Sequence, residues 1–77
     1  MGDVSGDILK ELRRGKGLTQ VDVAKYFGIS QSAYSLYETG ARRMPIAMLD
    51  ALADLLDTST DYILGRTPIS KPYPKRR

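Results

Sequence analysis

Apolar residues recur three and four positions apart through most of this chain, which is the spacing of one buried face on an α-helix. Ile8, Leu9 and Leu12 form one such stripe and predict a helix over about 7–14. Val4 leads into this helix. No stretch of useful length alternates apolar and polar residues, so the pattern predicts no sheet. The fold class that the pattern favours is therefore all-α.

Residues that begin and end helices divide the next part of the chain into two short helices. Thr19 is a good N-cap, and Asp22 places a carboxylate in the first turn, where the helix dipole favours negative charge. Gly28 ends this second helix, because glycine readily adopts the left-handed conformation that follows a helix. Ser30 then caps a third helix over Gln31–Thr39.

The following part of the chain predicts two more helices. Pro45 suits the first position of a fourth helix, and Thr58 or Ser59 caps a short fifth helix. Four glycines are expected at helix ends: Gly15, Gly28, Gly40 and Gly65. The apolar residues expected to face inward are Ala24, Phe27 and either Val21 or Val23 in the second helix, and Ile46, Leu49, Leu52, Ala53 and Leu56 in the fourth.

Composition excludes several classes of protein. The 77 residues can hold one domain, and no apolar run approaches the roughly 18 residues of a membrane span. No secretory signal segment is evident, so we expect a cytoplasmic protein. The chain has no cysteine and no histidine, which excludes disulfides, thiolate or imidazole metal sites and the Ser–His or Cys–His nucleophile. We therefore expect no enzyme activity, metal or cofactor, and no small-molecule ligand is evident.

Charge is distributed unevenly along the chain. Residues 1–43 carry a net +2, residues 44–66 a net −3 and residues 67–77 a net +4. A basic surface favours polyanions, although +2 alone is equally typical of an ordinary solvated surface. The last segment, TPISKPYPKRR, holds three prolines and no acid, which predicts an extended basic arm. Three interpretations of it stay open, namely a phosphate-binding arm, a linker to a further domain and a disordered end.

The third predicted helix has two unlike faces. At 100° per residue, one face holds Gln31, Ser32, Ser35, Leu36 and Thr39, and the other holds Ala33, Tyr34, Tyr37 and Glu38. The first face lacks the lysines and glutamates that are good formers of solvated helices. Glutamine can form two hydrogen bonds with adenine in the major groove, and leucine can contact the thymine methyl. This face is either a DNA-reading surface or a neutral solvated one, while the tyrosines are expected in the core.

The spacing around Gly28 favours a DNA-reading surface. Ala24 lies four residues before Gly28, where two helices must nearly touch. Val23, Phe27 and Ile29 can fill the wedge between the helices, and Tyr34 and Tyr37 follow Gly28 as anchors. A small residue, a glycine turn and then apolar anchors are what a helix-turn-helix needs to present its second helix.

Two stretches resemble a known family. LTQVDVAKYFGISQSAYSLYETGARR, Leu18 to Arg43, resembles the helix-turn-helix of the phage repressor and Cro-like (XRE-type) family, and MLDALADLLDTSTDYILGRT, Met48 to Thr67, resembles its fourth and fifth helices. The matching positions are Thr19, Gln20, Ala24, Gly28, Glu38, Gly40, Asp61, Tyr62 and Gly65. The resemblance implies a compact five-helix lambda-repressor-like DNA-binding domain over 7–66, with the helix-turn-helix at about 19–38 and a basic, proline-rich tail over 67–77.

The resemblance also implies roles for individual residues. The base-reading positions are Gln31, Ser32, Ser35 and Leu36, and the phosphate-binding positions are Lys16, Gln20, Thr39, Arg42 and Arg43. Gln20 is also expected to brace the third helix, and Arg13 and Glu38 match a pair that bridges the first and third helices. The remaining structural positions are Ala24, Gly28, Tyr34 and Tyr37.

The chain departs from the family pattern in three ways. Leu36 is apolar where many members carry a polar or basic residue, and Tyr34 is larger than the usual aliphatic anchor. The third helix has no lysine or arginine, so nonspecific affinity must come from other residues: Arg14, Lys16, Arg42, Arg43 and the tail.

The expected function is that of a sequence-specific, double-stranded DNA-binding transcriptional regulator, a repressor acting by operator occupancy. The alternative is an antitoxin-like or anti-repressor module that binds protein, which the uncharged third helix also permits. The family usually binds DNA as a dimer, here expected through the fourth and fifth helices. The candidate residues either form a patch between two copies or close the core of one: Ile46, Met48, Leu55, Tyr62 and Ile63.

Overall fold

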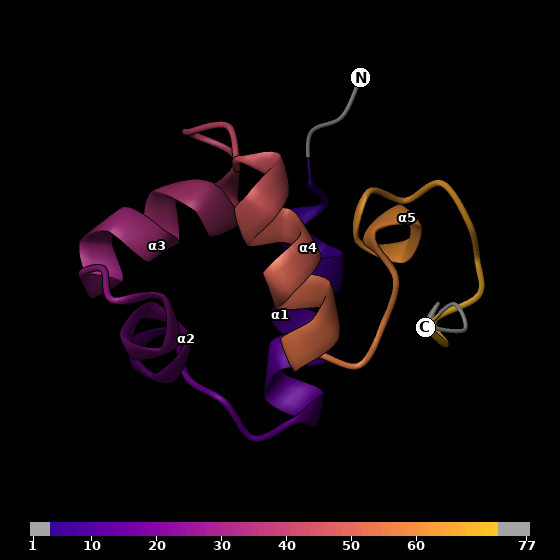
Figure 1. The fold of residues 1–77 in the computed structure, drawn as a ribbon, viewed down its shortest axis with the longest axis horizontal. Helices are drawn as coiled ribbons and strands as arrows, with labels where there is room; N and C mark the ends of the chain where they lie inside the picture. The colour runs from indigo at the N-terminus through magenta and orange to yellow at the C-terminus, as the bar shows by residue number, and fades with distance from the viewer. Residues whose placement is uncertain (1–3, 73–77) are drawn as a thin grey trace.

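The computed structural model describes residues 4–72, which form five α-helices (Figure 1). The helices are α1 (Gly6–Gly15), α2 (Gln20–Phe27), α3 (Gln31–Thr39), α4 (Ile46–Leu55) and α5 (Thr60–Ile63). No strand occurs in the described residues, and the predicted all-α class with five helices is confirmed.

A single core receives a buried side chain from every helix. Leu9 of α1, Val23 of α2, Tyr34 of α3, Leu52 of α4 and Ile63 of α5 are all inaccessible to solvent. α2 packs against α3, while α1 contacts both α3 and α5. In Figure 1, α2 and α3 form one side of the molecule and α5 lies on the other. The orientation of α3 is therefore set mainly by α1 and α2.

Local caps decide where the helices begin and end, and the predicted start of α4 at Pro45 was wrong by one residue. Gly15 is the last helical residue of α1, one position beyond the predicted span of about 7–14, and the chain then turns at Gly17, which has a φ of 72°. Pro45 is the N-cap of α4 rather than its first residue, since its ψ of 149° is extended. The predicted ends at Gly28 and Gly40 are confirmed, with both residues left-handed.

The structure resolves the alternatives that the apolar pattern left open. Val23 is buried, whereas Val21 is exposed on the outside of α2. Ser59 caps α5 by accepting a hydrogen bond from the Tyr62 amide, so Thr58 is free for another role. The Thr58 hydroxyl donates to the Ser70 carbonyl oxygen at 2.6 Å.

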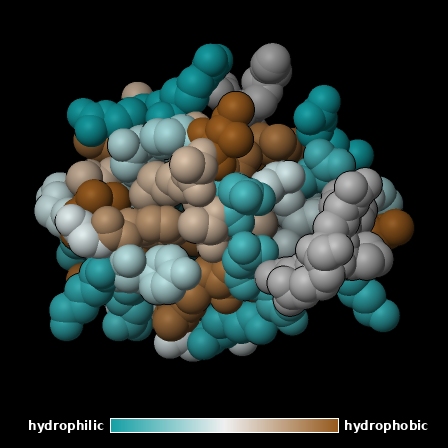
Figure 2. All heavy atoms as spheres, in the orientation of Figure 1, coloured by the Kyte–Doolittle hydropathy of each residue, from teal (hydrophilic) through white to brown (hydrophobic). Residues whose placement is uncertain are grey.

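The residues proposed for a dimer patch differ in their exposure to solvent. Ile63 lies fully in the monomer core, and Met48, Leu55 and Tyr62 are partly buried. Ile46 is 83% exposed, and apolar side chains reach the surface over the start of α4 in Figure 2. Any apolar patch is therefore smaller than the sequence suggested and includes Ile46 but not Ile63.

The C-terminal segment departs from the helical body. Residues 67–72 form no helix and run beyond α5, on the side of the molecule away from α3 (Figure 1). The hydrogen bond from Thr58 to Ser70 ties this segment to the end of α4. The rest of the predicted basic tail, 73–77, lies outside the described residues, and the division of the chain near residue 66 stays a prediction.

Candidate nucleic-acid interface

The α2–α3 pair has the local geometry of a helix-turn-helix. Thr19 and Asp22 form a capping box at the start of α2, each side chain accepting a hydrogen bond from the backbone amide of the other. These hydrogen bonds hold the pKa of Asp22 below its usual value. Gly28 turns the chain with a φ of 69°, and the Ser30 hydroxyl then caps α3. Ala24 is 2% exposed, so its small side chain allows the two helices to pack closely.

The two faces of α3 lie as the helical geometry predicts. Four of the five outer residues are exposed and the fifth, Ser35, is half-buried; the exposed ones are Gln31, Ser32, Leu36 and Thr39. Tyr34 and Glu38 are buried on the opposite face, and Tyr37 packs against the core while partly exposed. The outer face is thus available to a partner, with Leu36 as its apolar centre.

A buried ion pair anchors α3 to α1. Arg13 Nε lies 2.9 Å from Glu38 Oε2, and Arg13 Nη2 donates to Glu38 Oε1 at 3.1 Å. The third donor of this guanidinium, Nη1, reaches the Leu18 carbonyl at 2.9 Å. Since both side chains are almost fully buried, the pair fixes the relative position of the two helices more than it adds stability. The contact predicted between Arg13 and Glu38 is present.

Two further donors complete the surroundings of the Glu38 carboxylate. Gln20 Nε2 donates to Oε1 at 2.9 Å, and the Tyr34 hydroxyl donates to Oε2 at 3.0 Å. Burial alone would raise the pKa of Glu38, but the hydrogen bonds from Arg13, Gln20 and Tyr34 bring it below its usual value. Burial and the adjacent carboxylate raise the pKa of Tyr34. Glu38 is therefore ionised at neutral pH, and its carboxylate accepts four hydrogen bonds within the protein.

The network continues to the outer face of α3. Gln31 Nε2 donates to Gln20 Oε1 at 3.4 Å, so the first residue of α3 is joined through Gln20 to the buried Glu38. The contacts with Glu38 and Gln31 join Gln20 to α3, the helix that it was expected to brace, although Gln31 itself was not predicted as its partner. The bond from Tyr34 to Glu38 was also missed, although their spacing of four on one helix face is a signal for it.

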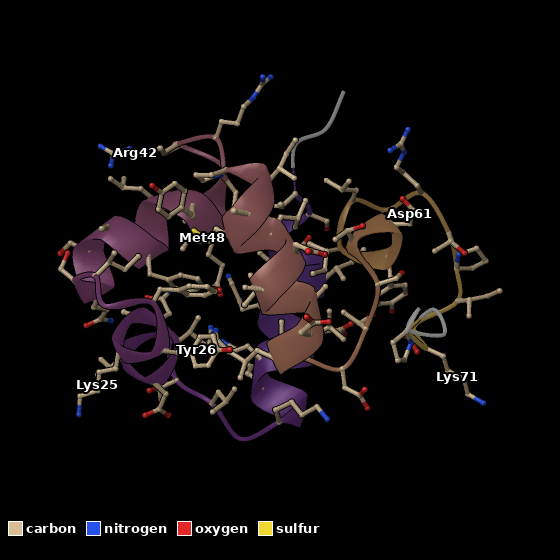
Figure 3. The ribbon with its side chains drawn as sticks, viewed as in Figure 1. Lys25, Tyr26, Arg42, Met48, Asp61 and Lys71 are labelled. Carbon is tan, nitrogen blue, oxygen red and sulfur yellow. The ribbon has the colours of Figure 1, made fainter. Side chains whose placement is uncertain are left out.

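The basic residues near α3 lie in the loop that follows it. The Arg42 amide donates to the Leu36 carbonyl at 3.0 Å, and its guanidinium lies 5.9 Å from the centre of the Tyr37 ring. Arg43 is exposed in the same loop. Figure 3 shows Arg42 and Lys25 at the end of the molecule that carries α2 and α3, with Asp61 and Lys71 at the opposite end. Lys25 is an exposed cation on α2 that sequence reasoning did not assign to the site.

Besides Gln20, two of the predicted phosphate-binding residues form a hydrogen bond or an ion pair within the protein. The Thr39 hydroxyl donates to the Leu36 carbonyl at 3.3 Å, within α3. Lys16 Nζ lies 3.9 Å from Asp57 Oδ2, at the junction of α1 with the end of α4. Lys16 is thus paired at another part of the protein than the loop that carries Arg42 and Arg43. Gln20, Gln31 and Glu38 are joined by hydrogen bonds.

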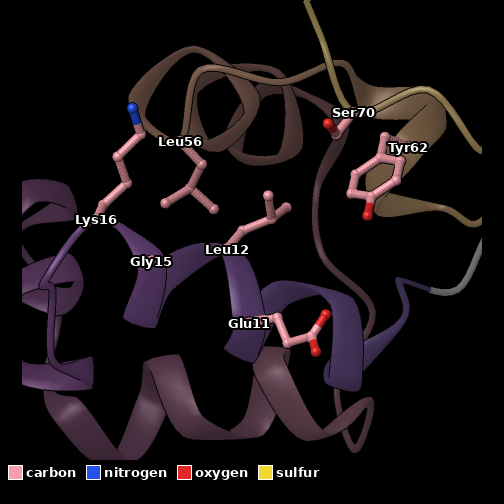
Figure 4. A pocket seen from close by; sticks show the side chains of 7 residues that line it. All are labelled: Glu11, Leu12, Gly15, Lys16, Leu56, Tyr62 and Ser70. Atoms are coloured by element: carbon pink, nitrogen blue, oxygen red, sulfur yellow. The ribbon is translucent and has the colours of Figure 1, made fainter.

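A hollow of about 470 Å³ lies beside Lys16, between α1, the end of α4 and α5 (Figure 4). Its lining residues are Glu11, Leu12, Gly15, Lys16, Leu56, Tyr62 and Ser70. In the described part of the chain, no group of acidic residues is arranged to hold a metal ion. No helix within residues 4–72 has the length and apolar character needed to cross a membrane.

Comparison with known proteins places these features in context. The helix-turn-helix family matches residues 9–63. The chain is 39% identical over 69 residues to the uncharacterized HTH-type transcriptional regulator YobD of Bacillus subtilis, covering 90% of this chain and 62% of YobD. It is 41% identical over 69 residues to the HTH-type transcriptional regulator AnsR of the same organism, covering 90% of this chain and 60% of AnsR.

A third relative carries a different name. The chain is 30% identical over 67 residues to the antitoxin PezA of Streptococcus pneumoniae, covering 87% of this chain and 42% of PezA. All three relatives are thus longer than the region they share with this chain. No solved structure gives a significant match.

Proposed function

The chain belongs to the helix-turn-helix family, and we propose that it is a sequence-specific, double-stranded DNA-binding transcriptional regulator. The observation that carries this proposal is the outer face of α3, whose uncharged side chains are exposed while Tyr34 and Glu38 anchor the helix from behind. The names of YobD and AnsR, both HTH-type transcriptional regulators, agree with it. The family and these names indicate a DNA-binding regulator rather than an enzyme.

We propose that α3 enters the major groove with Gln31 as its principal base-reading residue. One amide hydrogen of Gln31 is engaged by Gln20. Its second amide hydrogen and its carbonyl oxygen remain for N7 and N6 of an adenine, which is the bidentate contact that glutamine makes best. Leu36, 39% exposed, would then contact a thymine methyl, and Ser32 and Ser35 would bond to bases or nearby phosphates.

The phosphate contacts in this proposal come mainly from the loop after α3. Arg42 and Arg43 are exposed there, and each phosphate that they neutralise contributes about −0.9 to the slope of log affinity against log salt. Gln20, the first residue of α2, and Thr39, the last residue of α3, are proposed to contact the DNA backbone as well. Lys16 would contribute less, because Asp57 partly offsets its charge.

Repression by occupancy is the mode of action that we propose. A regulator bound at an operator excludes polymerase without any chemistry of its own, and the protein would act in the cytoplasm. A homodimer formed through α4 and α5, including the exposed Ile46, would place two copies of α3 about 34 Å apart, which is one turn of DNA. The chain spans about 60% of the length of YobD and AnsR, so the assembly of a whole protein is part of this proposal.

Selection of bound duplexes from a random pool tests the proposal. The selected duplex and a scrambled duplex of the same composition are then compared by gel shift at two salt concentrations. We expect the selected duplex to bind about 10³-fold more tightly or better, with a steep salt dependence for both. Equal binding of the two duplexes would refute sequence-specific recognition.

The second candidate is an antitoxin-like module that binds a partner protein. Two observations favour it, namely the absence of lysine and arginine from α3 and the similarity to a protein named antitoxin PezA. The same selection separates the two functions. A pool in which no duplex is enriched, together with a stable complex with a partner protein in size-exclusion chromatography, would favour the antitoxin-like module.

A further inference from the structure

Gly6, the first residue of α1, lies directly against the backbone of α3. A Cβ atom on Gly6 would stand 2.6 Å from the carbonyl oxygen of Glu38 and 3.7 Å from its carbonyl carbon. Because the obstacle is backbone, no change of side-chain rotamer relieves it. Carbon-to-oxygen contacts are about 3.3 Å or longer, so a side chain here would push the two helices apart by about 0.7 Å.

Glu38 of α3, which lies against Gly6, is also bound by Arg13 near the other end of α1. Arg13 lies seven residues after Gly6, which is nearly two full turns, so both residues face α3. At Gly6 the contact is backbone to backbone, whereas at Arg13 a long side chain spans the gap to the Glu38 carboxylate. Leu9, which lies between them in the sequence, is completely buried. Of these two contacts, the one at Gly6 therefore brings the backbones of α1 and α3 closer together.

We propose that Gly6 is a positioning residue for DNA recognition, because its missing side chain sets the angle between α1 and α3. The proposal rests on the DNA-binding function proposed above. Gly15, at the other end of α1, has no atom within 4 Å of where its Cβ would lie. Of the two glycines of α1, only Gly6 thus lies close to another helix.

A change in this angle should affect base recognition more than phosphate binding. Glu38 and Gln31 are seven residues apart on the same rigid helix, so a shift at one end tilts the other. Bidentate hydrogen bonds to a base weaken steeply when their alignment is lost. The flexible side chains of Arg42 and Arg43 can follow the phosphates over the same distance.

Gly6→Ala and the matched control Gly15→Ala test the proposal. Residual dipolar couplings of the α1 and α3 amides report the angle between the helices in the free protein. Gel shifts give the selectivity ratio, which is the affinity for a selected duplex divided by that for a scrambled one. For Gly6→Ala we expect a changed angle and a selectivity ratio lower by about tenfold or more, with scrambled-duplex affinity within about twofold. Gly15→Ala should leave both unchanged.

An unchanged angle, or an unchanged selectivity ratio, in Gly6→Ala would overturn the proposal. If the unmodified protein prefers no duplex, the proposed function fails, whereas the dipolar couplings still decide whether Gly6 sets the angle. If Gly6→Ala does not fold, the unmodified protein and both variants are compared in an Asp57→Gly background, because the left-handed residue Asp57, with a φ of 56°, favours glycine. All three proteins then share any effect of removing Asp57 from Lys16. Absence of nuclear Overhauser contacts between the Gly6 α-protons and Glu38 or Thr39 in the unmodified protein would also refute the close approach.

Discussion

The substitution Glu38→Gln removes the one charge at the centre of the network that holds α3. Its carboxylate accepts two hydrogen bonds from Arg13, one from Gln20 and one from Tyr34. A glutamine keeps the shape of the side chain and one acceptor oxygen. Its amide nitrogen is a donor, however, and would face the donors that now bind the carboxylate, on Arg13, Gln20 or Tyr34. The Arg13 guanidinium would lose its countercharge in a site that is 7% exposed.

The expected loss of stability is large for a domain of this size. Removing one partner of a buried ion pair costs about 3–5 kcal/mol, because the remaining charge is left uncompensated. The free energy of unfolding of a small domain is roughly 5 kcal/mol or somewhat more, and it falls by about 1 kcal/mol per molar urea. We therefore expect the urea midpoint of Glu38→Gln to fall by about 3–5 M, or the chain to be largely unfolded without urea.

Urea unfolding followed by circular dichroism at pH 7 measures this effect. Glu11→Gln is the matched control, since Glu11 is exposed on α1, and its stability should change by less than about 0.5 kcal/mol. Equal stabilities for the two variants would show that the Glu38 network does not hold the fold, and the argument that it anchors α3 would fail.

The pH dependence gives a second measurement of the same network. The pKa of Glu38 is lower in the folded protein than its usual value, so its contribution to stability is complete above about pH 4.3 and is lost as the pH falls through the folded pKa. Glu38→Gln has no such group to protonate. The difference in stability between the unmodified protein and this variant should thus shrink below about pH 4.3, and a constant difference would contradict the assigned pKa.

Four further predictions concern DNA binding and the helix ends. Gln31→Ala should lower the affinity for the selected duplex by about 1–3 kcal/mol and relax the specificity at one base position in a gel-shift series, and equal losses across all sequences would contradict its role. Arg43→Ala should weaken binding to all duplexes alike and reduce the slope of log affinity against log salt by about one. Deleting residues 71–77 should flatten the salt slope by several charges if the tail binds phosphates, and an unchanged slope would dismiss that role. Asp57 has a φ of 56°, so Asp57→Gly should raise the free energy of urea unfolding by about 0.5–1 kcal/mol, whereas Asp50→Gly inside α4 should not.

Most helix boundaries follow from residues close together in the chain. Ser30 caps α3 through the Ala33 amide and Gly40 ends it in the left-handed conformation, so the predicted span Gln31–Thr39 is that of the structure. The differences at Gly15 and Pro45 are of one residue each, since Gly15 is still helical with Lys16 as the cap, and Pro45 is the N-cap of α4 with an extended ψ of 149°. The exposure of the outer face of α3 was also predictable, since helical geometry alone separates Gln31 from Tyr34.

Contacts between distant residues needed the tertiary structure unless a family pattern suggested them. The pair Arg13–Glu38 and a bracing contact from Gln20 to the third helix were expected from the resemblance, but nothing in the pattern named Glu38 and Gln31 as the two partners of Gln20. A glutamine at the start of a helix can point to solvent, to phosphate or to a neighbouring helix, and only the packing of α2 on α3 selects the last. Burial of Val23 rather than Val21 has the same origin.

The chain by itself determined an all-helical fold, the position of the helix-turn-helix and the uncharged face of α3, because propensity, caps and the 3.6-residue period act over a few residues. The tertiary structure decided what stands behind that face, namely the saturated carboxylate of Glu38 and the bare backbone of Gly6 against it. The physical reason is that a carboxylate's partners and a glycine's close neighbour are set by how separate helices pack, which no local rule specifies.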